Sequence, residues 1–170
     1  DKRTLMQVFQ EQRIKDPNIA VSIGPNVFLN DKNLNYLPLT GVANQRTIQC
    51  NENGYYAFYQ SDRYGFNNPD NEWNKDIIDF LLIGDSFTAG ACVNEPDTIS
   101  GNLKKLNNKN ANGILNLGQI GSGTLVQYAT LREYLEIKKV RRVILIYYEG
   151  NDLDDIRTEF KNKILLNYLK

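Results

Sequence analysis

The chain has 170 residues, long enough for one domain with a hydrophobic core of its own. It carries 20 lysines and arginines and 20 aspartates and glutamates, so its formal net charge is zero and no overall field favours nucleic acid or an anionic membrane as a partner. No apolar run is long enough to predict a membrane-spanning helix. The chain contains no histidine, which removes the commonest general base and the commonest metal ligand at once. We expect no metal and no cofactor.

Residues 1–75 predict an N-terminal extension made of one helix and short strands. Apolar residues at positions 5, 8 and 9 follow helical spacing, and Pro17 ends the pattern. The β-rich runs 46–50 and 55–59 flank Asn51–Gly54, and an Asn-Gly pair between such runs indicates a β-hairpin. The tyrosines of the second run favour packing across the strands, with an aromatic sugar-binding platform as the alternative.

Two further features bear on chemistry. Cys50 and Cys92 are more typical of two buried thiols than of a disulfide. Residues 61–73 form an irregular polar segment, which is typical of a loop beside a site. Within this segment, Arg63 either binds an anionic group of a substrate or pairs with a neighbouring carboxylate.

After Asp76 the pattern changes to alternating strands and helices. Apolar runs predict three strands, at 77–83, 114–117 and 143–148. The last of these is almost wholly apolar, as a parallel strand buried on both faces should be. Helical patterns occur at 99–106, where Asp97-Thr98 offers a cap, at 124–137, and from about 153 to the C-terminus. This order predicts the α/β class, with a narrow parallel sheet covered by helices on both faces.

Small and polar residues follow each predicted strand where that strand ends. Ser86 follows the first, Gly121 the second and Asn151 the third. Because the carboxyl ends of parallel strands meet at one edge of the sheet, we expect these residues to lie close together. A serine hydroxyl can attack a carbonyl if a base removes its proton. The N–H groups of Ser86 and Gly121 and the Asn151 amide can hold the resulting oxyanion, so the set predicts acyl transfer.

Other interpretations of the same stretches stay open. Ser86 alone is also typical of a helix N-cap, and Asp85 is expected to fix the turn rather than to act as an acid. The glycine-rich run 118–123 matches neither a dinucleotide-binding fingerprint nor a P-loop, although a phosphate cradle is an alternative. Four carboxylates after the third strand could hold Mg²⁺ or Ca²⁺, but the dipole of the following helix also explains them. They are Glu149, Asp152, Asp154 and Asp155.

Three motifs at these strand ends resemble the first three sequence blocks of the SGNH (GDSL-type) hydrolases. They are Gly84-Asp85-Ser86-Phe87, Asn116-Leu117-Gly118 with Gly121, and Gly150-Asn151-Asp152. Residues 61–69 also resemble N-terminal extensions of longer bacterial members. The resemblance implies a three-layer α/β/α sandwich with a flavodoxin-like parallel sheet, and an esterase, lipase, thioesterase or carbohydrate acetylesterase. It implies Ser86 as the nucleophile, with Gly121 and Asn151 as donors of the oxyanion hole.

The fourth block of that family, Asp-x-x-His, supplies the base and the acid that orients it, and this chain has no histidine. We expect a truncation before that block rather than a natural loss of the chemistry, and little activity from the chain as it stands. The expected division is an extension over 1–75 and the N-terminal part of an SGNH hydrolase domain over 76–170. The expected substrates are small-molecule or carbohydrate acyl esters, O-acetyl esters among them. The alternative is a non-catalytic glycan-binding module.

Overall fold

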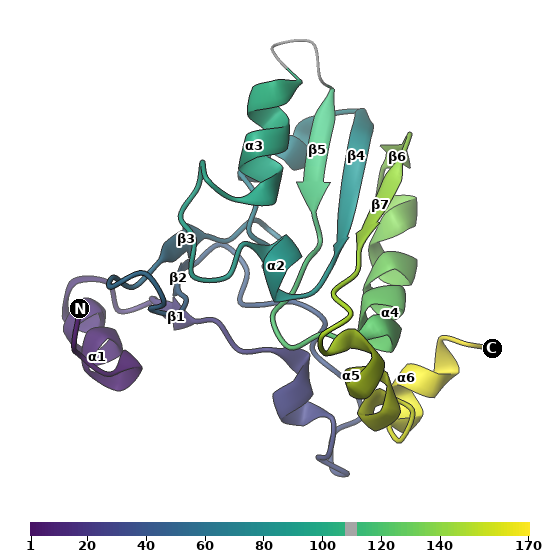
Figure 1. Cartoon of the computed structure of the whole chain (residues 1–170), viewed down its shortest axis with the longest axis horizontal. Coiled ribbons are helices and arrows are strands. Elements are labelled where there is room, and N and C mark those ends of the chain that lie inside the picture. Colours follow the sequence, from purple (N-terminus) through teal and green to yellow (C-terminus); the bar gives the residue numbers. More distant parts are fainter. Residues whose placement is uncertain (108–111) are drawn as a thin grey trace.

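The computed structural model describes residues 1–107 and 112–170, and within them the fold is mixed α/β (Figure 1). The strands are β1 (Ala20–Val21), β2 (Arg46–Ile48), β3 (Phe58–Gln60), β4 (Ile77–Gly84), β5 (Gly113–Asn116), β6 (Lys139–Val140) and β7 (Val143–Ile146). The α-helices are α1 (Leu5–Lys15), α2 (Ser86–Ala89), α3 (Ile99–Leu106), α4 (Thr124–Tyr134), α5 (Asp152–Glu159) and α6 (Lys163–Asn167). Short 3-10 helices are η1 (Pro25–Phe28), η2 (Asp70–Asn74) and η4 (Leu135–Ile137). Among these residues no helix has both the length and the apolar character needed to cross a bilayer.

The larger sheet is built around β4. β5 pairs with one side of β4, while β6 and β7 follow one another along the other side, and every pair is parallel. Three of the apolar residues of β4, Ile78, Leu81 and Leu82, are at most 1% exposed. The narrow parallel sheet that the alternating pattern predicts is therefore confirmed.

The third predicted strand differs from its expectation. β7 covers only 143–146, and Val143 and Leu145 are 42% and 54% exposed instead of buried. These side chains are exposed because β7 lies at the edge of the sheet, where within the described residues it pairs with β4 on one side only. Its apolar composition does not by itself produce burial.

The helices of the second half also depart from the predicted pattern at one point. Of the predicted cap pair Asp97-Thr98, Thr98 caps α3 by accepting a hydrogen bond from the N–H of Gly101 at 3.0 Å. The single C-terminal helix that was expected is instead two helices, α5 and α6. Asn162 explains the break, because its side-chain oxygen caps α6 through the N–H of Ile164 at 2.9 Å, while its amide donates to the Leu29 carbonyl at 3.0 Å.

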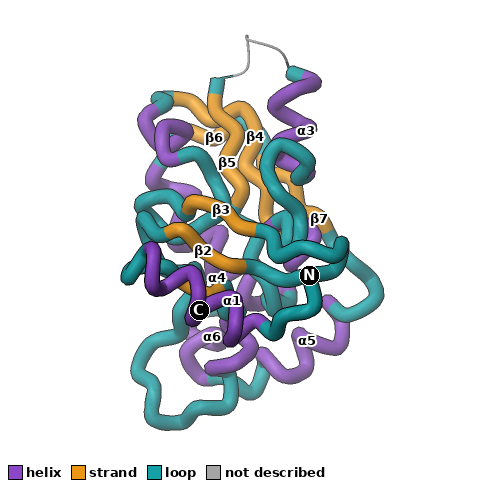
Figure 2. The backbone as a smooth tube through the Cα atoms, turned by 90° about the vertical axis from the view of Figure 1, so that its left-hand side faces the viewer, coloured by secondary structure: helices purple, strands orange, loops and turns teal. Residues whose placement is uncertain are grey.

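The smaller sheet contains the predicted hairpin. β2 and β3 pair antiparallel, β1 adds to β2 in parallel, and the hairpin loop carries Gly54 in the left-handed region at φ +81°. Figure 2 shows β2 and β3 lying across the direction of β4 and β5. Tyr59 is 8% exposed, as packing across the strands requires, whereas Tyr55 is 42% exposed.

Cys50 and Cys92 form a disulfide, so the expectation of two free thiols is wrong. The bond joins the end of the hairpin's first arm to the segment that follows α2, across a sequence separation of 42. The spacing of two cysteines does not say whether the fold brings them together, and here the Cα atoms lie 4.8 Å apart.

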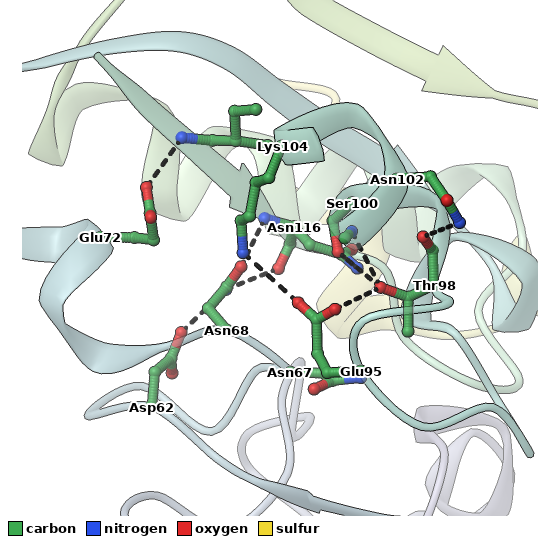
Figure 3. A network of polar contacts seen from close by, with 12 residues as sticks. Asp62, Asn67, Asn68, Glu72, Glu95, Thr98, Ser100, Asn102, Lys104 and Asn116 are labelled. Atoms are coloured by element: carbon green, nitrogen blue, oxygen red, sulfur yellow. Dashed lines mark hydrogen bonds and ion pairs between the residues drawn. The ribbon is translucent and has the colours of Figure 1, made fainter. Parts of the chain in front are cut away.

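The predicted polar segment 61–73 is irregular up to Pro69 and continues into the 3-10 helix η2. Several of its polar side chains, drawn in Figure 3, are buried. Asp62 is 0% exposed. Its carboxylate accepts hydrogen bonds from the Trp73 indole at 2.6 Å, from the Asn68 amide at 2.9 Å and from two backbone N–H groups of the segment at 2.9 Å. These bonds compensate the cost of burying a charge.

Side chains of this segment also occupy the outer edge of β5. The Asn68 amide donates to the Asn116 carbonyl at 2.9 Å and accepts from the Asn116 N–H at 2.8 Å. Glu72 accepts from the N–H of Ile114 at 2.9 Å. These side chains therefore satisfy backbone groups that a further strand would otherwise pair, and they attach the extension to the sheet.

Arg63 pairs with a carboxylate, the second of its two predicted roles. Its guanidinium lies 2.7 Å from Asp70, and the same group donates to Asn74 at 2.7 Å. The pairing raises the pKa of Arg63 and lowers the pKa of Asp70.

Asp62→Ala is expected to lower the free energy of unfolding by about 3–5 kcal/mol, because it leaves buried N–H donors without an acceptor. Urea denaturation followed by far-UV circular dichroism measures the change. Asp97→Ala is the matched control, since that carboxylate is 76% exposed in its pair with Lys105, and its removal should change stability little. An equally small loss for Asp62→Ala would contradict the role given to this carboxylate.

The double variant Cys50→Ser/Cys92→Ser is expected to lose about 2–4 kcal/mol of stability, because the disulfide restricts the unfolded chain. The reduced wild-type chain provides the control and should unfold at the same urea concentration as the variant. A wild-type midpoint that does not move on reduction would show that the bond contributes nothing.

Candidate active site

The three predicted site residues follow strands that end at the same edge of the sheet (Figure 1). Ser86 is the first residue of α2, directly after β4. Gly121 lies in the loop between β5 and α4, and Asn151 directly precedes α5 after β7. Because β5 and β7 both run parallel to β4, their carboxyl ends point the same way.

A chain of hydrogen bonds joins the three loops. The Ser122 hydroxyl lies 3.2 Å from the Gly84 carbonyl, at the end of β4. The Gln127 amide donates both to the Ser122 carbonyl at 3.1 Å and to the Asp152 carboxylate at 3.2 Å. The second oxygen of Asp152 accepts from the N–H of Tyr148 at 2.8 Å. Since Asp152 is 0% exposed, this chain fixes the loops from within the core.

The turn that carries Ser86 is held by Asp85. The Asp85 side chain accepts from the N–H of Phe87 at 2.9 Å and is the N-cap of α2. Asp85 therefore fixes the turn, as predicted. The alternative interpretation of Ser86 as a helix N-cap is wrong, because Asp85 is the cap. Ser86 is the first residue of the helix and is half-buried.

The loop after β5 needs glycine at two positions. Gly121 has φ +63°, a left-handed conformation, and a Cβ there would collide with the side-chain amide of Asn26. A Cβ on Gly118 would collide with the backbone at Thr88 and Ala89, so this glycine lets the loop approach α2 closely. The Gly121 N–H is thus carried by a loop that packs against both the extension and the turn of Ser86.

Asn151 is already engaged in one hydrogen bond. Its amide donates to the Asp155 carboxylate at 2.7 Å. An asparagine amide has two N–H bonds, and within residues 1–107 and 112–170 the Asp155 bond is the one the Asn151 amide makes. Nearby, the rings of Phe87 and Tyr148 lie 4.8 Å apart and connect the turn after β4 with the turn after β7.

Burial shapes the electrostatics beside Ser86. Burial raises the pKa of the Asp85 carboxyl, and the negative charge of Asp152 raises it further. One oxygen of Asp85 and the hydroxyl of Thr88 are buried without a hydrogen-bond partner among the residues that the structure describes. The turn that carries Ser86 therefore contains a poorly solvated carboxyl whose raised pKa disfavours ionisation.

A second buried carboxylate, Glu159, holds the N-terminus of α4. It is 0% exposed and accepts from the N–H groups of Gly123 at 2.6 Å and Leu125 at 2.8 Å. Burial raises the pKa of Glu159 in spite of these bonds. A polar residue within a helix ordinarily faces water, so the sequence predicts no role for Glu159 of α5 or Gln127 of α4. Only their place in the fold reveals them as supports of the loops.

The four carboxylates after β7 do not gather into a cation site. Within residues 1–107 and 112–170 no cluster of three potential ligands is suited to a metal ion. Their partners lie elsewhere, because Asp152 binds Gln127, Asp155 binds Asn151, and Asp154 pairs with Arg157 at 3.2 Å.

A hollow of about 310 Å³ adjoins the loop that carries Gly121. Ile120 forms one wall, and the extension forms the others through side chains of mixed character. They are Leu5, Ser22, Gln49, Cys50, Asn51 and Tyr56. The hollow places an aromatic ring, hydroxyl and amide groups beside the residue that precedes Gly121, which is the composition of a small-ligand pocket.

The arrangement offers a hydroxyl, N–H donors and a neighbouring hollow, whereas the sequence holds no histidine to act as the base of a serine mechanism. No family model, no curated protein and no solved structure matches the chain. The resemblance to the SGNH hydrolases therefore stays a prediction that depends on three short motifs.

Replacing Asp85 by asparagine is expected to remove a pH dependence. Because the pKa of Asp85 is higher in the folded chain, the folded state binds more protons between the ordinary value and the raised one. The contribution of Asp85 to stability is thus greatest below its ordinary pKa and is lost as pH rises through the raised pKa. The wild-type free energy of unfolding minus that of Asp85→Asn, measured in urea titrations, should fall as pH rises above the ordinary pKa of an aspartate. A difference that stays level or grows with pH contradicts the raised pKa.

Proposed function

We propose that this chain is the serine-nucleophile portion of an SGNH-type hydrolase, or acyltransferase, that acts on acyl esters. In this proposal Ser86 attacks the ester carbonyl. The N–H groups of Ser86 and Gly121 and the Asn151 amide bind the oxyanion. The observation that carries the proposal is the hydrogen-bond chain from Gly84 to Asp152, since it ties the three loops together at one sheet edge.

The mechanism assigns each group one task. The Ser86 oxygen forms a bond to the acyl carbon as a base takes the hydroxyl proton, and the alcohol leaves with a proton returned by that base. In hydrolysis, water then attacks the acyl-enzyme, again with the base accepting its proton, and Ser86 leaves with a proton returned by that base. In acyl transfer, an acceptor alcohol takes the place of water. Each oxyanion donor is worth about 3–4 kcal/mol of transition-state stabilisation. The base has to come from outside these residues.

Two local features support this assignment. The positive φ of Gly121 orients its peptide in a way that other residues adopt only at a cost, and the packing on Asn26 leaves no room for a side chain. Asp155 restrains the Asn151 amide through one N–H bond, which would orient the other. We further propose that the fold is the three-layer α/β/α sandwich of the family, with 1–75 as its extension and 76–170 as the hydrolase part.

The hollow beside Ile120 supports an ester substrate with a small polar alcohol, such as a carbohydrate O-acetyl ester. Its Tyr56 ring offers an apolar face, and Ser22 and Asn51 offer polar groups. The same hollow supports a second candidate, a glycan-binding module without catalysis, which the missing histidine favours.

Ester turnover supplemented with imidazole tests the nucleophile. Imidazole is a small external base, so it should raise the hydrolysis of an aryl acetate by the wild-type chain beyond the rate it produces with Ser86→Ala. Asn151→Ala should lower this Ser86-dependent rate by about 10²–10³-fold through the loss of an oxyanion donor. Asn167→Ala, an exposed asparagine on α6, is the control and should retain it. Equal rates for the wild type and Ser86→Ala at every imidazole concentration would remove Ser86 from the mechanism and leave the binding module.

A further inference from the structure

A polar hollow of about 580 Å³ lies between β3 and the loop 67–70. The segment after α2 completes its walls with Asn94 and Glu95. Figure 1 shows β3 on the β5 side of the larger sheet, away from β7. Because Asn68 and Glu72 occupy the outer edge of β5, a further strand of this sheet would add at β7 and leave the hollow open.

Both walls of the hollow are held by contacts within the chain. The disulfide joins Cys92 to the hairpin, and the Asn94 side chain accepts a hydrogen bond from the N–H of Phe58 at 3.1 Å, so the segment after α2 is attached to the hairpin. On the other side, Asn68 donates to the buried carboxylate of Asp62 at 2.9 Å. A ligand that enters a hollow with fixed walls pays little conformational entropy for ordering them.

Two asparagines of the walls each use one end of their side-chain amide. Asn67 is 7% exposed, and its nitrogen donates to the Ala89 carbonyl at 3.0 Å. Asn94 uses its oxygen, which accepts from Phe58. Within residues 1–107 and 112–170 these are the bonds that the two side chains make. The pair therefore offers a ligand an acceptor oxygen at Asn67 and donor N–H bonds at Asn94.

The outer edge of β3 adds backbone groups to the same lining. In an antiparallel pair, residues bonded to the partner strand alternate with residues whose N–H and C=O point away from it. Ser61 donates inward to Gln45 at 2.9 Å, whereas Phe58 donates outward to Asn94. By this alternation Phe58 and Gln60 both direct their backbone groups away from β2, and the exposed Gln60 side chain supplies a further amide.

The charged residues among the described lining are both acidic. Asp70 pairs with Arg63 at 2.7 Å, and Glu95 pairs with Lys104 at 3.5 Å (Figure 3). Neither of these two cations lines the hollow. An anionic ligand would therefore be repelled by the carboxylates, whereas a hydroxyl group, which both donates and accepts, suits the amides and the backbone groups.

We propose that this hollow binds an uncharged oligosaccharide. Sugar hydroxyls donate to the Asn67 oxygen and the Phe58 carbonyl, and they accept from the Asn94 and Gln60 amides. Pro69 adds apolar surface for the C–H groups of a sugar ring. The volume of about 580 Å³ lies within the range of small-molecule sites.

This saccharide site is separate from the hollow beside Ile120, because the two share no lining residue. It adjoins α2 through the bond from Asn67 to Ala89, the last residue of that helix. A bound saccharide would thus lie beside the helix that begins at Ser86. Binding there requires no catalysis, so the inference stands independently of the role of Ser86.

Titration of the isotope-labelled 170-residue chain with neutral trisaccharides, followed by amide NMR spectra, tests the inference. The sugars are cellotriose, maltotriose, xylotriose and triacetylchitotriose, with trigalacturonate as the anionic comparison. We expect at least one neutral sugar to bind with a dissociation constant on the order of 1 mM and to shift the side-chain amide signals of Gln60, Asn67 and Asn94. Trigalacturonate should bind at least about tenfold more weakly than that sugar.

Asn94→Asp separates the donors from the fold. It keeps an oxygen that accepts from Phe58 but removes the N–H donors, so the dissociation constant should rise at least about tenfold. Asn18→Asp, the same change at an exposed asparagine after α1, is the control and should leave the constant as it is. Circular dichroism spectra confirm that both variants are folded.

Three results overturn the inference. One is the absence of any signal shift with all four neutral sugars up to about 20 mM. Another is binding that Asn94→Asp leaves unchanged, or that is tighter for trigalacturonate. The third is a set of shifts confined to Gln49 and Asn51, which would assign the sugar to the hollow beside Ile120 and support the glycan-binding alternative instead.

Discussion

The buried carboxylate of Asp62 is the constraint on which the rest of this structure depends. A charge with no exposed surface is tolerated only when several donors surround it, and Trp73 and Asn68 are among those that do. Asn68 in turn pairs with the backbone of Asn116 on β5. One polar centre thereby holds the extension, the tryptophan and the edge strand together. The sequence predicts residues 61–73 as a loop beside a site, whereas in the structure they connect the N-terminal extension to the larger sheet.

Asn116 connects this buried polar centre to the candidate site. Asn116, held by Asn68 through its backbone, uses its own side chain to bond the Thr88 carbonyl and the Gly118 N–H. The glycine loop is thus attached to the turn of Ser86 at its start, and Ser122 attaches it to Gly84 at its end. Pre-organisation of this kind is what an oxyanion site requires, because donors that are already oriented need no rearrangement in the transition state.

The residues that position the site differ in kind from those that local patterns reveal. Ser86, Gly121 and Asn151 are recognisable since each follows a strand and suits one chemical task. Gln127 and Glu159 lie within helices, where a polar residue ordinarily faces water, yet both are buried and bond loop atoms. Their roles arise from which helix face meets the loops, and this depends on how α4 and α5 pack together.

By itself the sequence determined the alternation of strands and helices after Asp76, the hairpin, a helix cap at Asp97-Thr98, and the strand-end positions of Ser86, Gly121 and Asn151. These follow from local periodicity, turn chemistry and the rule that parallel strands end together. Only the tertiary structure decided that Cys50 meets Cys92, that β7 lies exposed at an edge, and that Asn162 divides the last helix. Each of these depends on contacts between segments far apart in the chain. The composition of a short window does not encode such contacts. The same apolar residues form a buried strand or an exposed edge strand, and the same cysteine stays a thiol or forms a disulfide, depending on which segments pack beside them.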